Sequence, residues 1–127
     1  MPDQQLFEYA VIRLVPRVER EEFLNLGVVV FCKKQNYLGV KFIIDKTKIN
    51  AFAPAIEIDC VEDSLNSLLK ISRADKDGGP IAKLDTAGRF RWLTATKSTI
   101  LQTSKIHPGL SEDPAATLEK LFDKLVL

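Results

Sequence analysis

Two apolar runs joined by a charged connector constrain the fold of this chain more than any other feature. The runs span residues 9–15 and 26–32, and both are rich in valine, isoleucine or phenylalanine. Pro16 begins the connector and Gly27 ends it. Apolar runs of this length, bounded by turn residues, are typical of strands that are buried on both faces. We therefore expect two central strands of a sheet, with the connector crossing between them.

The first third of the chain predicts an antiparallel meander of three strands. Residues 7–15 and 28–33 form the first two strands, and residues 37–44 form a third with clean alternation of its side chains. Gly27 stands where the second strand begins. A glycine there predicts a bulge or a close approach of two backbones.

Two helices are predicted from their capping residues. Asp59 is expected to be the N-cap of the first helix, because Glu62 three residues later completes a capping box. Asp113 is expected to cap the last helix, with Pro114 in its first position.

Between these helices the sequence predicts a break and then a hairpin. Residues 75–80 contain two glycines, a proline and three charged side chains, so we expect a mobile loop. Residues 89–95 and 99–106 are expected to be two strands, because basic and aromatic side chains alternate in the first of them. The turn between them falls at residues 96–98, and residues 108–109 end the hairpin.

The order of these elements predicts an α+β fold, a mostly antiparallel sheet of about five strands with two main helices packed on it. The chain has 127 residues, of which 46% are hydrophobic and 28% charged. Those values are typical of one globular domain, and we expect residues 1–127 to form it.

Charge and composition argue against several classes of protein. The formal net charge is only +1, so nucleic acid is not an expected partner. No apolar run has the length of a membrane span, and the N-terminus lacks a secretory signal, so we expect a cytoplasmic protein without membrane contact. Cys32 and Cys60 are expected to be reduced thiols. With His107 as the single histidine, neither a metal site nor a cofactor is predicted.

Arg13 is the first candidate site residue, because it is a charged side chain on an apolar strand. A buried arginine requires a partner, and Glu22 on the connector is the expected one, with Asn25 completing the network. We predict a direct and mostly buried Arg13–Glu22 pair with a structural role. The functional alternative is an anion site, where Arg13 and Arg20 donate to a phosphate or carboxylate.

The second half offers further candidates around the predicted hairpin. Trp92 and Thr94 lie on its first strand, Ser98 and Thr99 at its turn, and His107 at its end. Aromatics alternating with basic residues could bind single-stranded nucleic acid. The simpler interpretation is a half-buried strand with its aromatics facing inward, and a small polar pocket at the turn. A lone histidine at a strand end is more often structural than catalytic.

Two blocks of this sequence resemble the signature of a bacterial family of short proteins known only as a domain of unknown function. The first block is Tyr-Ala-Val-Ile-Arg-Leu-Val-Pro at residues 9–16, followed by Glu-Phe-Leu-Asn-Leu-Gly-Val-Val at residues 22–29. The second block comprises residues 91–95, 98–99, 107–109 and 113–114. The resemblance implies a stand-alone bacterial domain encoded near a kinase similar to those of toxin–antitoxin systems. It implies no particular activity.

These observations favour a non-catalytic interaction or regulatory module that binds a protein partner. The resemblance adds a toxin-like kinase as a possible partner. The alternative is a small-ligand-binding or hydrolytic enzyme that acts on a phosphorylated or nucleic-acid substrate at the cluster of Arg13 and Asn25. An accessible pocket joining Arg13, Glu22 and Asn25 would favour the alternative, and a closed salt bridge the structural role.

Overall fold

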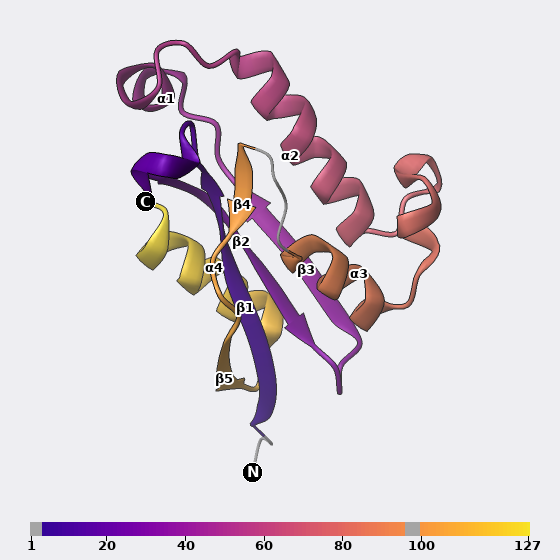
Figure 1. Ribbon diagram of the computed structural model, residues 1–127. Helices are drawn as coiled ribbons and strands as arrows, with labels where there is room; N and C mark the ends of the chain where they lie inside the picture. The colour runs from indigo at the N-terminus through magenta and orange to yellow at the C-terminus, as the bar shows by residue number, and fades with distance from the viewer. Residues whose placement is uncertain (1–3, 96–99) are drawn as a thin grey trace.

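The computed structural model describes residues 4–95 and 100–127 of the chain. Figure 1 shows a twisted antiparallel sheet with helices on both faces. The strands are β1 (Gln5–Leu14), β2 (Leu24–Cys32), β3 (Tyr37–Phe42), β4 (Leu101–Thr103) and β5 (His107–Ser111). The helices are α1 (Lys46–Phe52), α2 (Ile58–Ser72), α3 (Thr86–Thr94) and α4 (Pro114–Leu125), with short 3-10 turns at Val18–Arg20, Lys76–Gly78 and Pro80–Lys83. The predicted α+β class with an antiparallel sheet is confirmed.

The strand β1 lies at the centre of the sheet. The order is β3-β2-β1-β4, and β5 pairs with the other half of β1 on the same side as β4. The predicted meander of β1, β2 and β3 is therefore confirmed. So is the irregularity at Gly27, because the register of β1 and β2 shifts there, between Ile12 and Arg13. A Cβ atom on Gly27 would lie 2.5 Å from the carbonyl oxygen of Lys41, so the close backbone approach requires glycine.

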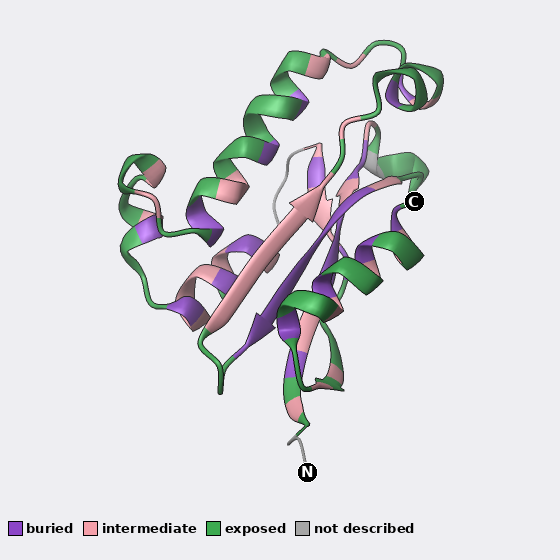
Figure 2. Cartoon of the chain, turned by 180° about the vertical axis from the view of Figure 1, so that it is seen from behind, coloured by how far each residue is buried: buried purple, intermediate pink, exposed green. Residues whose placement is uncertain are grey.

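The two faces of the sheet carry separate parts of the core. On one face, Leu118 and Phe122 of α4 and the C-cap residue Val126 pack onto Val28 and Val30. On the other face, α2 and α3 cover the sheet, and the purple buried segments in Figure 2 face inward from both sides. The buried residues of this second face fall into two clusters. They are Ile12, Leu14, Leu26, Ile49, Ala53, Val61, Leu65 and Leu101, and then Ala10, Val29, Phe31, Ile71, Phe90 and Leu93.

The last helix begins as predicted. The Asp113 carboxylate accepts hydrogen bonds from the backbone N–H of Ala115 at 3.1 Å and of Ala116 at 3.2 Å, and Pro114 is the first helical residue. The predicted start of α2 is wrong. Its N-cap is Glu57, which makes no side-chain capping bond, and Asp59 lies inside the first turn. Asp59 there faces the positive end of the helix dipole, which suits an acid without making it a cap.

Residues 89–95 are not a strand, because most of them belong to α3. The alternation of Arg and aromatic side chains suggested a period of two, whereas the buried residues are Phe90 and Leu93, three apart. Phe90 stacks on Phe31 of β2 with ring centroids 4.9 Å apart. Arg89 donates through Nη1 to the carbonyl oxygens of Ile71 at 3.1 Å and Ser72 at 2.8 Å, which ties α3 to the end of α2.

The second predicted hairpin strand is also replaced. The described part of residues 99–106 contains only the short β4, and β5 follows it on the same side of β1. Residues 108–109, expected to end the hairpin, lie inside β5, where Gly109 faces the ring of Phe7. Between the two strands, the Ser104 hydroxyl accepts a hydrogen bond from the backbone N–H of Val11 at 2.8 Å. The predicted turn at residues 96–98 lies outside the described residues.

The segment at residues 75–80 forms two 3-10 turns. Its start is tied to α2, because the backbone N–H of Asp75 donates to the carbonyl oxygen of Lys70 at 3.0 Å, and the Lys70 ammonium pairs with Asp77 at 2.8 Å. That ion pair raises the pKa of Lys70 and lowers the pKa of Asp77, in each case mainly through their mutual hydrogen bond. The mobility of this segment stays a prediction.

Candidate functional site

Arg13 lies on the face of the sheet that α4 covers. Its neighbour Ile12 belongs to the core under α2, and successive strand residues point to opposite faces. Asn25 is the cross-strand partner of Arg13 on β2 and donates through Nδ2 to the carbonyl oxygen of Leu125 at 3.0 Å, near the end of α4. The Arg13 guanidinium carbon lies 3.9 Å above the ring centroid of Phe23, a cation–π contact at the edge of this face.

The predicted ion pair between Arg13 and Glu22 is wrong. Glu22 pairs with Arg20 instead, and both of these side chains are more than half exposed. Strand β2 begins at Leu24, so Glu22 and Phe23 form the last step of the connector, and it is Phe23 that contacts Arg13. Within the described residues, Arg13 Nε and Asn25 Oδ1 are buried without a hydrogen-bond partner. Arg13 is therefore held by an aromatic ring and not by a carboxylate.

Arg20 and Glu22 contribute to a shallow pocket at the end of the sheet. Its volume is about 390 Å³, and the connector residues Pro16 and Arg17 also line it, together with residues 52–56 at the end of α1 and just beyond it. Arg13 does not line this pocket. The structure thus separates the two arginines that were expected to share one anion.

His107 and Thr94 each make a contact within the fold, one with an aromatic ring and one with a backbone carbonyl. His107 pairs with Tyr9 across β5 and β1, and the two rings are 5.2 Å apart between centroids. Tyr9 and Arg13 are four strand residues apart, about 13 Å, so His107 does not join Arg13 in one site. The Thr94 hydroxyl donates to the carbonyl oxygen of Phe90 at 2.9 Å, inside its own helix. Ser98 and Thr99 lie outside the described residues.

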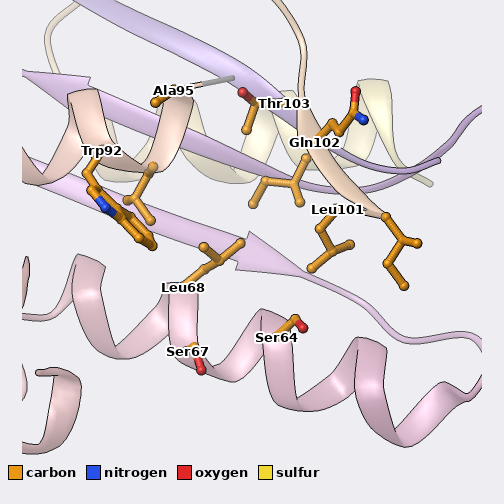
Figure 3. A pocket seen from close by; sticks show the side chains of 11 residues that line it. Ser64, Ser67, Leu68, Trp92, Ala95, Leu101, Gln102 and Thr103 are labelled. Carbon is orange, nitrogen blue, oxygen red and sulfur yellow. The ribbon is translucent and has the colours of Figure 1, made fainter. Parts of the chain in front are cut away.

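A different pocket lies between α2, α3 and β4, on the face opposite Arg13 (Figure 3). Its volume is about 240 Å³. The apolar residues that line it are Ile12, Leu68, Leu93, Ala95, Ile100 and Leu101, and the polar ones are Ser64, Ser67, Trp92, Gln102 and Thr103. Ser64 and Ser67 are exposed on α2, so the pocket opens to solvent along this helix.

The lining of this pocket has a simple chemical character. Most of it is aliphatic or aromatic, and the hydroxyl-bearing residues Ser64, Ser67 and Thr103 also line it. Of the described residues that line it, none is ionisable. The Thr103 hydroxyl is already engaged, because it donates to the carbonyl oxygen of Thr94 at 3.3 Å. Such a surface can bind an apolar group, and it offers no side chain from the described residues for proton transfer near neutral pH.

Among the predicted site residues that the structure describes, Trp92 lines this pocket, and it was predicted on a strand. Ser64, Ser67 and Leu68 were not predicted as site residues, because residues 59–69 were interpreted only as an amphipathic helix. A signal was present in the sequence. Two serines three residues apart lie beside the apolar stripe of α2, where larger apolar side chains would have closed the face.

Two titratable groups elsewhere have a shifted pKa. Burial raises the pKa of Tyr37 on β3, and the nearby carboxylates of Asp113 and Glu119 add to the effect. The hydrogen bond from Cys60 to Glu57 raises the pKa of this exposed thiol, and the charge of Glu57 acts in the same direction. Cys60 is therefore less often a thiolate at neutral pH than an ordinary cysteine.

Among residues 4–95 and 100–127, no group of three or more His, Cys, Asp and Glu side chains could hold a metal ion. In the same part of the chain, no helix has the length and apolar character required to cross a bilayer.

Of the comparisons with known proteins, the one with protein families gave a match. Searches of curated proteins and of solved structures each found no significant match. A family model does match, and it covers residues 9–126, which include both blocks of the resemblance noted in the sequence. The chain therefore belongs to the family described as protein of unknown function, DUF3037.

Proposed function

We propose that this chain is a non-catalytic module that binds a protein partner through the pocket between α2, α3 and β4. The observation that carries the proposal is the lining of this pocket, which is mainly apolar and without an ionisable side chain among the described residues. Hydrolysis and group transfer generally require a nucleophile, an acid or a base at the reacting atoms. The candidate acids and bases lie elsewhere, at the connector and on β5.

A protein side chain suits this pocket in both size and character. Interfaces owe most of their affinity to a few apolar or aromatic anchors that enter preformed pockets, surrounded by a polar rim. Here Leu68 and Leu101 supply apolar walls, and Ser64 and Ser67 supply the polar rim on α2. We expect one large apolar side chain of the partner to enter the pocket.

The sequence resemblance suggests which protein to test first. It implies a bacterial origin and a nearby gene for a toxin-like kinase, so that kinase is our first candidate partner. We place the complex in the cytoplasm, where the free thiols of Cys32 and Cys60 would stay reduced. Recognition through an apolar pocket also accounts for a partner-binding protein whose net charge is only +1.

Site-specific crosslinking in the source cell tests this proposal. A photo-crosslinking amino acid at Ser67 should yield one discrete adduct with the partner protein. The matched control places the same amino acid at Asn66, the adjacent exposed residue on α2 that does not line this pocket. Co-expression with the candidate kinase, followed by purification of the complex, would then identify the adduct.

The control makes the outcome decisive. The proposal predicts an adduct at Ser67, little or none at Asn66, and loss of the adduct when Leu68 is replaced by Asp. Equal adduct formation at both positions, or none at either in cells that express the protein, would contradict it. Circular dichroism of each variant shows whether the fold is retained.

A second function is favoured by Arg13 itself. Among the described residues its guanidinium pairs with no carboxylate, and Arg13 Nε and Asn25 Oδ1 are both unbonded. We propose as the alternative that a small phosphorylated or carboxylate ligand, or a nucleic-acid substrate, binds at this position, with hydrolysis as the further possibility. Arginine is well suited to this role because its planar fork matches such anions.

Thermal shift measurements separate the two functions. A ligand at about a hundredfold its dissociation constant stabilises a fold by roughly 2.7 kcal/mol. A screen of nucleotides, sugar phosphates and dicarboxylates should therefore raise Tm for a true anion site, and Arg13→Lys should abolish the increase. The partner-binding proposal predicts no specific shift from any of these compounds.

A further inference from the structure

The outer edge of β3 is the least protected part of the sheet. Among the described residues, β3 pairs only with β2 and has no strand on its other side. Its pairing with β2 is regular, without a bulge, and its six residues include no proline. The opposite edge is different, since it is made of the short β4 and of β5, which contains Pro108. Short strands and prolines are common ways to block an edge, and β3 lacks both.

Three residues of β3 direct their backbone groups away from the sheet. The backbone N–H of Ile43 donates to the carbonyl oxygen of Leu26 at 2.9 Å, which fixes which residues of β3 bond to β2. Bonding alternates along an antiparallel pair, so Leu38, Val40 and Phe42 point their N–H and C=O groups outward. Within the described part of the chain, no hydrogen bond satisfies these outward groups.

The side chains of the same three residues are also incompletely covered. Leu38, Val40 and Phe42 pack against the core under α2 and α3, yet each remains half-buried. The charged residue of β3, Lys41, points to the other face, where it pairs with Glu119 and lies 4.7 Å from the ring centroid of Phe122. A further strand at this edge would bury apolar surface and bond six backbone groups at once.

We propose that β3 pairs with β3 of a second copy of this chain, antiparallel and centred on Val40, so that two sheets join into one. In this register Val40 faces Val40 of the partner subunit, and Leu38 faces Phe42 of the partner subunit. All three outward-pointing residues then fall in hydrogen-bonded pairs, and apolar side chains meet apolar side chains. A two-fold axis through Val40 relates the copies, as in most homodimers.

The register also explains why a second copy fits better than an unrelated strand. The position opposite Lys41 is Gly39 of the partner subunit, so the two lysines do not face each other. A like-charged pair directly opposite would oppose association. Self-pairing therefore satisfies backbone, apolar and charge requirements with the single sequence Tyr37–Phe42. The inference is independent of the proposed function, because no residue of β3 lines the pocket between α2, α3 and β4.

Mass and crosslinking together test the dimer with the full chain. Light scattering at increasing protein concentration should report twice the chain mass of 14.2 kDa. Val40→Cys in a Cys60→Ser background should crosslink efficiently between subunits with a short thiol reagent, because paired Cα atoms in this register are about 5.5 Å apart. Leu38→Cys in the same background is the matched control, since two copies of residue 38 would be separated by about 13 Å of strand.

The expected result is a dimer that crosslinks at residue 40 and at least tenfold less at residue 38. A monomer at every concentration up to about 1 mM would overturn the proposal. So would a dimer in which the two variants crosslink equally or not at all, because its contact would lie elsewhere. Circular dichroism must first show that each variant is folded. If Val40→Cys does not fold, Val40→Thr takes its place in the light-scattering measurement of mass.

Discussion

The two faces of the sheet are closed in different ways, although β1 and β2 contribute to both. On one face the single helix α4 lays an apolar stripe along β2 and β3, with Phe122 and Leu118 buried. On the other face, α1 contributes Ile49 to the core, and α2 and α3 run in different directions. A pocket of about 240 Å³ remains between α2, α3 and β4. One amphipathic helix can seal a surface that two helices leave partly open. The open face is where we expect a partner to bind.

The difference can be traced to side-chain size along the helices. The inward positions of α4 carry leucine and phenylalanine, and the buried Val126 follows at its C-cap. On α2, the short polar side chains of Ser64 and Ser67 line the pocket, where a larger apolar side chain would fill more of the space. Trp92 extends from α3 towards the gap without filling it (Figure 3).

The largest expected effect lies on the closed face. Phe122→Ala removes a buried aromatic ring from the core under α4 and should lower the free energy of unfolding by about 3–5 kcal/mol. Trp92→Ala on the open face should cost clearly less, because Trp92 lines the pocket and is only half-buried. Urea denaturation of both variants measures the difference. If the two losses were equal, the contrast between the faces would fail.

Replacing the aspartate at the start of the helix should also cost more stability on α4 than on α2. Asp113→Ala removes the side-chain cap of α4 and should destabilise the protein by about 1 kcal/mol. Asp59→Ala on α2 should cost only a few tenths of a kcal/mol, since Asp59 caps nothing and only complements the helix dipole. Denaturation midpoints of the two variants decide this. A larger loss for Asp59→Ala would restore the capping box predicted from sequence.

These two helices show why some of the fold could be predicted and some could not. The start of α4 was predicted correctly because capping aspartate, first-turn proline and apolar stripe all agree. Residues 86–94 offered no such agreement. The buried positions of α3 are few, and the local alternation around Phe90 and Trp92 suggested a strand, but packing on Phe31 overrode it.

The candidate site was less predictable than the fold, because it depends on contacts between distant residues. An arginine on an apolar strand was recognised correctly as needing a partner, yet sequence alone could not distinguish Glu22 from its neighbour Phe23. The pocket arises from residues on β1, α2, α3 and β4 that lie far apart in the chain, so the sequence does not show that they meet in one place. Trp92, which lines the pocket, was among the candidates beforehand.

The coupling between Arg13 and Glu22 should be close to zero. Glu22 pairs with Arg20, and Arg13 rests on Phe23, so the two side chains share no direct contact. A double-mutant cycle with Arg13→Met and Glu22→Gln should therefore give an interaction energy below about 0.5 kcal/mol. A coupling of several kcal/mol would instead show the buried ion pair that the sequence suggested.

The smallest effect concerns Tyr37 at alkaline pH. Its folded-state pKa lies above the ordinary value of 10.0, mainly because of burial. The folded protein thus holds this proton more tightly than the unfolded chain, so stability is unaffected below about pH 10 and falls as the pH rises through the folded-state pKa. Tyr37→Phe should flatten this part of the stability profile. An unchanged slope in the variant would assign the alkaline loss to other groups.

The affinity of the purified partner for a protein with a filled pocket tests the central claim most directly. Ser64→Leu places a larger apolar side chain at the pocket, and Asn66→Leu makes the same kind of change on α2 outside it. Isothermal titration calorimetry should show at least a tenfold weaker Kd for Ser64→Leu and a Kd for Asn66→Leu within twofold of the unmodified chain. Equal affinity of all three folded proteins would contradict the claim that the open face binds the partner.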